Sequence, residues 1–320
     1  MSPPFQHQQR SYPAKLLLFG EYSIIYNGFG LAVPYKQFWG KWHDEAILPH
    51  YSNNQLHDFC AKLPGLQTEL SKLGCELRLN AFKNALRAGL IFDSNIPNGY
   101  GMGSSGAVVA AFYERFCRNI TPSEKNANNT DANSYANIRK SLAIIEGIYH
   151  YNSSGLDPFI SHMQQPVLLK NQENLELLPE SITNNLSALR FFLFDTGVRR
   201  FTGQLVEATR YKIENNPEVK AILLNQISLH AQQAAAAFIA KDKTTLEQNF
   251  EKISALQLAN FPELVPEKWH ALWQQGLDSK QFYLKLCGAG GGGFLLGIAL
   301  YDFEKIPSIL QPYLSQITWA

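Results

Sequence analysis

The sequence has no marked excess of either charge, since its 320 residues include 28 Lys and Arg against 27 Asp and Glu. A net charge of +1 gives the surface no general attraction to nucleic acid or to an anionic membrane. We therefore expect neither of these partners. A local basic pocket is still compatible with this balance.

Cysteines and long apolar runs are also scarce. None of the four cysteines forms a Cys-x-x-Cys pair, and they lie at Cys60, Cys75, Cys117 and Cys287. This scatter predicts reduced thiols. The longest apolar runs, LLLF (16–19) and FLLGIAL (294–300), are far shorter than the roughly 20 residues of a membrane span. The N-terminal residues lack the apolar core of a signal peptide, so we expect a cytoplasmic protein.

The length and the order of the expected elements predict two domains. A chain of 320 residues, 45% of them hydrophobic, exceeds the usual single-domain size. Strands and helices are intermixed without a regular repeat, which favours an α/β or α+β fold. We expect strands at 14–20 and 188–197, helices at 105–117, 138–150 and 218–242, and a strand–turn–strand unit at 281–300. The polar stretch 171–187 is the expected boundary, which gives domains 1–187 and 188–320.

A glycine-rich loop that leads into a helix is the first functional signal. The stretch PNGYGMGSSGAVVAAF (97–112) begins with four glycines and two serines in ten residues and continues as a small-residue apolar helix. Glycines let phosphate oxygens approach the backbone, and a helix N-terminus attracts negative charge. The hydroxyls of Ser104 and Ser105 add donors, or a ligand for magnesium. The alternative is a tight turn that binds nothing.

The common nucleotide motifs fit this loop poorly. Gly101, Gly103 and Gly106 satisfy G-x-G-x-x-G, but the dinucleotide fingerprint should follow a strand directly, and 97–100 intervene here. The closing Gly-Lys-Ser/Thr of the P-loop is absent.

Two further segments identify the loop. Together with it, PAKLLLFGEYSIIYNGFGLAVP (13–34) and LKLCGAGGGG (284–293) resemble the three motifs of the GHMP kinases, in the family's order. The resemblance implies an α+β protein of two α/β domains. Its N-terminal domain would be ribosomal-protein-S5-domain-2-like, its C-terminal domain ferredoxin-like, and its active site would lie between them. The phosphate-binding motif maps onto Pro97, Gly101, Met102, Gly103, Ser104, Ser105 and Gly106.

Within that family the chain is most similar to the mevalonate kinases. SSGLDP (153–158) resembles their S-G-x-D segment, and TGVRRFTGQLV (196–206) resembles a further stretch. Tyr22 departs from the histidine of their first motif and looks more like phosphomevalonate kinase. The resemblance implies catalytic residues Asp157 and Lys15 and metal ligands Ser105 and Glu146. Its implied substrate contacts are Glu21, Tyr22, Arg200, Thr202, Gly288, Ala289 and Gly290.

These roles agree with elementary chemistry. Magnesium prefers oxygen ligands, and Asp157 can accept a proton from an attacking alcohol. Lys15 begins an apolar strand, where a charge is costly unless paired, so we expect an ion pair with Asp157. The ordinary alternatives are a solvated helix carboxylate at Glu146, a turn aspartate at Asp157 and exposed arginines at 199 and 200.

The resemblance therefore implies an ATP-dependent kinase that uses Mg²⁺ and phosphorylates a small-molecule alcohol, with mevalonate as the first choice. Phosphomevalonate or another alcohol or sugar is the alternative substrate. A catalytically silent sensor of the same fold is the alternative of a different class. We expect a monomer or a homodimer.

Overall fold

The chain forms two compact units that are each discontinuous in sequence. The structure is a computed structural model that describes residues 10–44, 54–119, 130–149, 153–171, 174–199, 202–300 and 308–319, with the backbone alone at 119, 130–134, 202–204, 308, 314–317 and 319. The first unit contains 1–15, 34–97 and 102–164, and the second contains 16–33, 98–101 and 165–320. The two units therefore exchange short segments, and the predicted domain ranges 1–187 and 188–320 stay a prediction.

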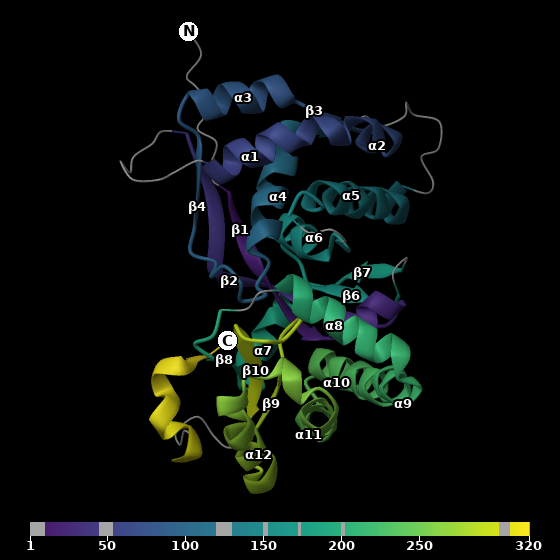
Figure 1. Ribbon diagram of the computed structural model, residues 1–320, viewed down its shortest axis with the longest axis vertical. Coiled ribbons are helices and arrows are strands. Elements are labelled where there is room, and N and C mark those ends of the chain that lie inside the picture. Colours follow the sequence, from purple (N-terminus) through teal and green to yellow (C-terminus); the bar gives the residue numbers. More distant parts are fainter. Residues whose placement is uncertain are drawn as a thin grey trace. The chain divides into compact units, whose positions relative to one another are not determined.

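Helices dominate the first unit, and they are α1 (Asn54–Lys62), α2 (Gln67–Lys72), α3 (Leu79–Arg87), α4 (Ser104–Phe116), α5 (Thr130–Glu146) and α6 (Leu156–Met163). Helix α4 packs against both α5 and α6 (Figure 1). Two short strands, β3 (Cys75–Leu77) and β5 (Cys117–Asn119), pair antiparallel beside them. The small side chains of α4 permit close packing, since Ala107, Ala110 and Ala111 are fully buried.

Two long strands contribute to both units. Strands β1 (Ser11–Phe19) and β2 (Gly30–His43) are neighbours in one sheet. The later part of β2 pairs antiparallel with β4 (Ile91–Ser94). Its first residues pair with β6 (Val167–Leu169), which in turn pairs with β7 (Leu175–Leu177). The apolar run at 14–20 therefore forms a strand, as predicted.

The second unit is built on an antiparallel sheet of order β11-β8-β10-β9. Its strands are β8 (Phe191–Asp195), β9 (Phe282–Leu286), β10 (Phe294–Ala299) and β11 (Ile317–Trp319). Its helices are α7 (Asn184–Ala188), α8 (Thr202–Asn215), α9 (Pro217–Ala221), α10 (Ser228–Ala240), α11 (Lys243–Asn260) and α12 (His270–Ser279). Helices α10 and α11 lie side by side, and α11 and α12 both contact β9 (Figure 1).

Most of the expected elements are present, with differences at their ends. Helix α4 begins at Ser104, one residue before the predicted start, and β9 and β10 form the predicted strand–turn–strand unit. Helix α5 begins at Thr130, eight residues before the predicted start at 138. The predicted helix at 218–242 contains a π-helical segment, Ile222–Ile227. None of the helices in the ranges described above is both long and apolar enough to cross a bilayer.

Candidate functional site

The glycine-rich loop turns into helix α4, as the sequence predicts. Gly103 directly precedes the helix and has φ 74°. It has no side chain that could cap the first turn, and that turn contains no acidic residue. A β-carbon at Gly103 would lie 3.3 Å from Asp157, and one at Gly106 would lie 2.8 Å from the backbone nitrogen of Pro158. Glycine at these two positions therefore allows α6 to pack closely against the start of α4.

The predicted ion pair between Lys15 and Asp157 is present in the first unit. Lys15 Nζ lies 2.9 Å from Asp157 Oδ1. The Lys15 side chain is 8% exposed, whereas that of Asp157 is 32% exposed. The backbone of Lys15 also donates to the carbonyl of Met102, at 2.9 Å, which ties strand β1 to the glycine-rich loop. A buried ammonium group therefore faces a carboxylate that solvent still reaches.

Asp157 itself differs from the turn aspartate that was the ordinary alternative. It lies in the first turn of helix α6, and Gly155, with φ 68°, is the residue that directly precedes the helix. A β-carbon at Gly155 would lie 2.3 Å from the carbonyl oxygen of Arg139 on α5. The close contact between α5 and α6 therefore fixes the position of the backbone from which the Asp157 side chain extends.

Glu146 is buried, which excludes its ordinary alternative as a solvated carboxylate. It is only 4% exposed at the end of α5. The hydroxyl of Ser105 lies 3.4 Å from its Oε1, and the hydroxyl of Ser153 donates to its Oε2. Burial raises the pKa of Glu146 to about 8, and the negative charge of Asp157 adds to the increase. The side chains of Ser153, Lys15 and Ser105 act in the opposite direction.

The oxygen atoms of Ser105 and Glu146 form a donor set that fits magnesium. This cation is held in proteins by one or two carboxylates together with phosphate oxygens and water. Among the described residues no group of three His, Cys, Asp or Glu could hold a metal ion by itself. A cation bound by Ser105 and Glu146 would therefore need phosphate or water oxygens to complete its coordination.

Two other predicted residues meet in the second unit. The hydroxyl of Tyr22 donates to the carbonyl of Ala289, at 2.7 Å. Tyr22 has φ 61°, a strained value for a residue with a side chain. Gly288 and Gly290 have φ 110° and 75°, and a β-carbon at Gly290 would lie 2.7 Å from Leu264. The first motif and the GAGGGG turn are therefore in direct contact.

Glu21, the neighbour of Tyr22, forms a buried ion pair. Lys285 Nζ contacts Glu21 Oε1 and also donates to the carbonyl of Leu286, at 2.7 Å. The two side chains are 0% and 2% exposed. Lys285 was not among the predicted residues. It could have been found by the signal that identified Lys15, because it too is a charged residue within an apolar strand. Ser153 was also missed as a partner of Glu146.

The remaining predicted residues are placed only in part. Arg200 lies outside the described residues, and Thr202 begins α8 without a described side chain. Arg199, considered beside Arg200, is exposed, and its Nε donates to the carbonyl of Asn98, at 3.3 Å. Pro97 precedes the turn that leads to Gly101, where φ is 77°. The roles assigned to all these residues stay predictions.

Comparison with known proteins bears on the family and the fold. Residues 69–164 match the family model described as the GHMP kinases N terminal domain. The chain is 24% identical to mevalonate kinase from Archaeoglobus fulgidus over 94% of this chain and 96% of the relative. The crystal structure of L. major mevalonate kinase in complex with R-mevalonate has a TM-score of 0.60 and 17% identity, over 94% of this chain and 91% of the other.

Phosphomevalonate kinases share the fold as well. The structure of the Streptococcus pneumoniae enzyme in complex with phosphomevalonate and AMPPNP has a TM-score of 0.62 and 13% identity, over 97% of this chain and 98% of the other. The fold, the three motifs and the matched N-terminal region lead to the same assignment. The chain resembles the GHMP kinases in its matched N-terminal region and is similar over most of its length to mevalonate kinases.

Proposed function

We propose that this protein is an ATP-dependent kinase that transfers the γ-phosphate of ATP to the primary hydroxyl of mevalonate. The observation that carries the proposal is the ion pair of Lys15 and Asp157 beside the glycine-rich loop. It brings a carboxylate that a substrate can reach next to a helix N-terminus suited to phosphate.

The proposed reaction needs few groups. Asp157 accepts the proton of the hydroxyl, whose oxygen then forms a bond to the γ-phosphorus while the bond to the bridging oxygen of ADP breaks. Lys15 compensates the negative charge of Asp157 and holds its carboxyl group in place. The backbone of 101–106 and the hydroxyls of Ser104 and Ser105 bind the phosphates.

Ser105 and Glu146 are the residues that would hold magnesium. The ion would neutralise charge on the phosphate oxygens during transfer. Because the pKa of Glu146 is raised to about 8, its carboxyl group carries a proton at neutral pH before a cation binds. Ionisation of Glu146 therefore accompanies metal binding.

Selection of mevalonate requires a cation for its carboxylate and a polar group near its tertiary hydroxyl. We assign the first role to Arg199 or Arg200 and the second to Thr202 or Tyr22. The relatives matched over most of the chain are mevalonate kinases, which favours this substrate over others of the family. Tyr22 in place of histidine is the observation that favours phosphomevalonate as the second candidate.

A coupled assay of ADP release with mevalonate, phosphomevalonate, homoserine and galactose tests the proposal. We expect mevalonate to be phosphorylated fastest at saturating ATP. Faster turnover of phosphomevalonate would contradict the choice of mevalonate as the substrate but not the proposed kinase activity. ATP binding without ADP release from any alcohol of the panel would favour a catalytically silent sensor.

A further inference from the structure

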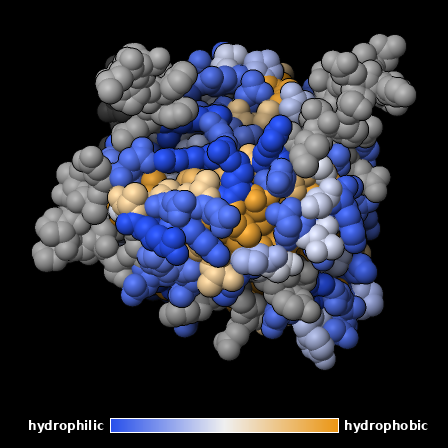
Figure 2. Space-filling view, turned by 90° about the horizontal axis from the view of Figure 1, so that it is seen from above, coloured by the Kyte–Doolittle hydropathy of each residue, from blue (hydrophilic) through white to orange (hydrophobic). Residues whose placement is uncertain are grey.

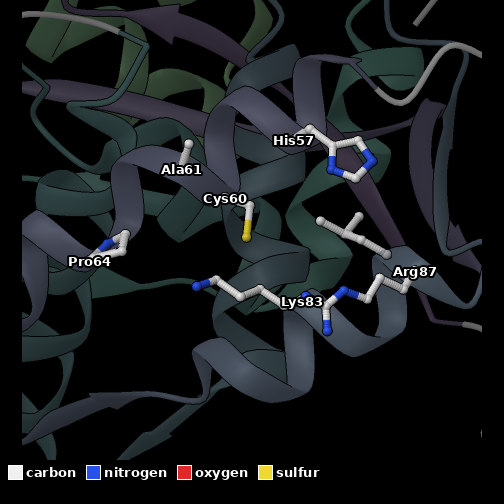
Figure 3. A pocket seen from close by; sticks show the side chains of 7 residues that line it. His57, Cys60, Ala61, Pro64, Lys83 and Arg87 are labelled. Carbon is white, nitrogen blue, oxygen red and sulfur yellow. The ribbon is translucent and has the colours of Figure 1, made fainter.

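A groove between helices α1 and α3 of the first unit has no part in the proposed reaction. It has a volume of about 360 Å³, at the small end of the range of roughly 300–1,000 Å³ that is usual for small-molecule sites. The side chains that line it are shown in Figure 3 and are those of His57, Cys60, Ala61, Pro64, Lys83, Leu86 and Arg87.

The spacing of these residues explains the groove. The lining residues between His57 and Pro64 recur at intervals of three and four residues, so they lie on one face of a helix. Lys83, Leu86 and Arg87 follow the same rule on α3. The groove is therefore the space between two helix faces that face each other, one on α1 and the turn after it and one on α3.

Its floor is apolar and held by packed aromatic rings. Cys60 and Leu86 are each 6% exposed. Their neighbours Phe59 and Phe82 pack edge-on against Phe112 of α4, with ring centres 5.1 and 5.0 Å apart. These contacts fix α1 and α3 on the same helix, so the groove exists before any ligand binds.

The rim is basic. Apart from the Cys60 thiol, the titratable groups that line it are those of His57, Lys83 and Arg87, and none of the lining residues in the described part of the chain carries a carboxylate. Arg87 Nη1 donates only to Asn84 Oδ1, at 3.4 Å, among the bonds recorded for the described residues. In Figure 3, His57 and Arg87 lie toward one end of the groove and Pro64 toward the other, while Lys83 extends beneath Cys60.

Figure 2 looks onto the side where α1, α2 and α3 lie in Figure 1, and it shows apolar residues bordered by hydrophilic ones. An apolar floor with a basic rim complements a ligand that has an apolar body and an anionic group.

We propose that this groove binds a small amphiphilic anion, whose apolar body covers Cys60 and Leu86 and whose anionic group is bound by Lys83 and Arg87. Binding is non-covalent, because burial raises the pKa of the Cys60 thiol and keeps it protonated near neutral pH. The proposal does not depend on the kinase activity, since none of these residues takes part in it.

Two matched probes test the proposal, naphthalene-2-sulfonate and the neutral naphthalene-2-sulfonamide, titrated into the intact protein by calorimetry. We expect one site for the sulfonate, at least about tenfold weaker binding of the sulfonamide, and no displacement of the sulfonate by excess ATP with magnesium.

Variants locate the site. Lys83→Glu removes one cation and, at a spacing of four residues, pairs with Arg87, so we expect sulfonate affinity to fall at least about tenfold. Lys72→Glu makes the same charge change on an exposed residue of α2 and should leave affinity unchanged. Ala61→Trp fills the groove from an exposed position and should weaken both probes.

Three results would overturn the proposal. The first is sulfonate binding that Lys83→Glu and Lys72→Glu affect equally or not at all. The second is competition between the sulfonate and ATP, which would place the probe at the glycine-rich loop. The third is the absence of sulfonate binding at millimolar concentration.

Discussion

Glu146 should make the folded protein less stable as the pH rises, and Glu146→Gln should remove this effect. The carboxyl group is 4% exposed, and burial together with the charge of Asp157 raises its pKa from 4.5 to about 8. The unfolded chain ionises this group above its ordinary pKa, whereas the folded chain retains the proton. The stabilising contribution is therefore complete below about pH 4.5 and is lost as the pH approaches 8.

The size of the effect follows from the same shift. Each pH unit within this window changes the free energy of unfolding by about 1.36 kcal/mol per proton. Between about pH 5.5 and 8, the wild type should lose roughly 3 kcal/mol of stability relative to Glu146→Gln. Glutamine keeps a similar shape beside Ser105 and Ser153 but does not titrate.

Urea denaturation of both proteins without metal or nucleotide, at several pH values across that window, measures the difference. Glu69→Gln is the matched control, because it makes the same change at an exposed position of α2. A stability difference between wild type and Glu146→Gln that stays constant with pH would refute the burial argument.

The same substitution should weaken the metal site. A neutral amide is a poorer ligand for magnesium than a carboxylate, so the magnesium concentration for half-maximal rate should rise. Calorimetry in buffers of different ionisation enthalpy should show that the wild type releases about one more proton than the variant when magnesium and ATP bind at pH 7. An unchanged magnesium titration would remove Glu146 from the proposed metal site.

Four further changes test other parts of the structure. Asp157→Ala should lower turnover by about 10²-fold or more with ATP binding retained, as a steady-state assay and a binding titration would show. Tyr22→Phe removes one hydrogen bond to the GAGGGG turn and should lower the free energy of unfolding by about 1 kcal/mol. Lys285→Met leaves Glu21 buried without its cation, which should cost roughly 3–5 kcal/mol in a urea titration. Burial lowers the pKa of His162 below 6.5, so its contribution to stability should be lost as the pH falls through about 6.5, and His162→Gln should show a smaller loss.

The glycine-rich loop was predictable because its signals are local. Glycine, serine and a small-residue run within sixteen positions specify both the turn and the start of α4 at Ser104. Lys15 was predictable for a different reason, since a charge at the start of an apolar strand implies a partner. Asp157 was the expected partner because it lies in SSGLDP (153–158), which resembles the S-G-x-D segment of mevalonate kinases.

Other features that depend on distant segments were not predicted. The weakly alternating stretch 75–82 splits into β3 and the start of α3, because pairing with β5 ends after Leu77. The contact between Glu21 and Lys285 joins residues 264 positions apart, and nothing in either segment alone specifies it. Such pairings are set by tertiary packing, which local pattern does not contain.

The two lysine–carboxylate pairs differ in the exposure of the carboxylate. This difference, and not the pairing itself, decides which carboxylate can take part in a reaction. Asp157 is 32% exposed, so a hydroxyl group can reach its oxygen while Lys15 balances its charge. Glu21 is 2% exposed and its partner is fully buried, so no substrate atom can reach that carboxylate without breaking the pair. A general base must lie within hydrogen-bond reach of the proton it takes, which Asp157 satisfies and Glu21 does not. Glu21 is therefore not suited to act as such a base while its pair with Lys285 is intact, and its role as a substrate contact stays a prediction.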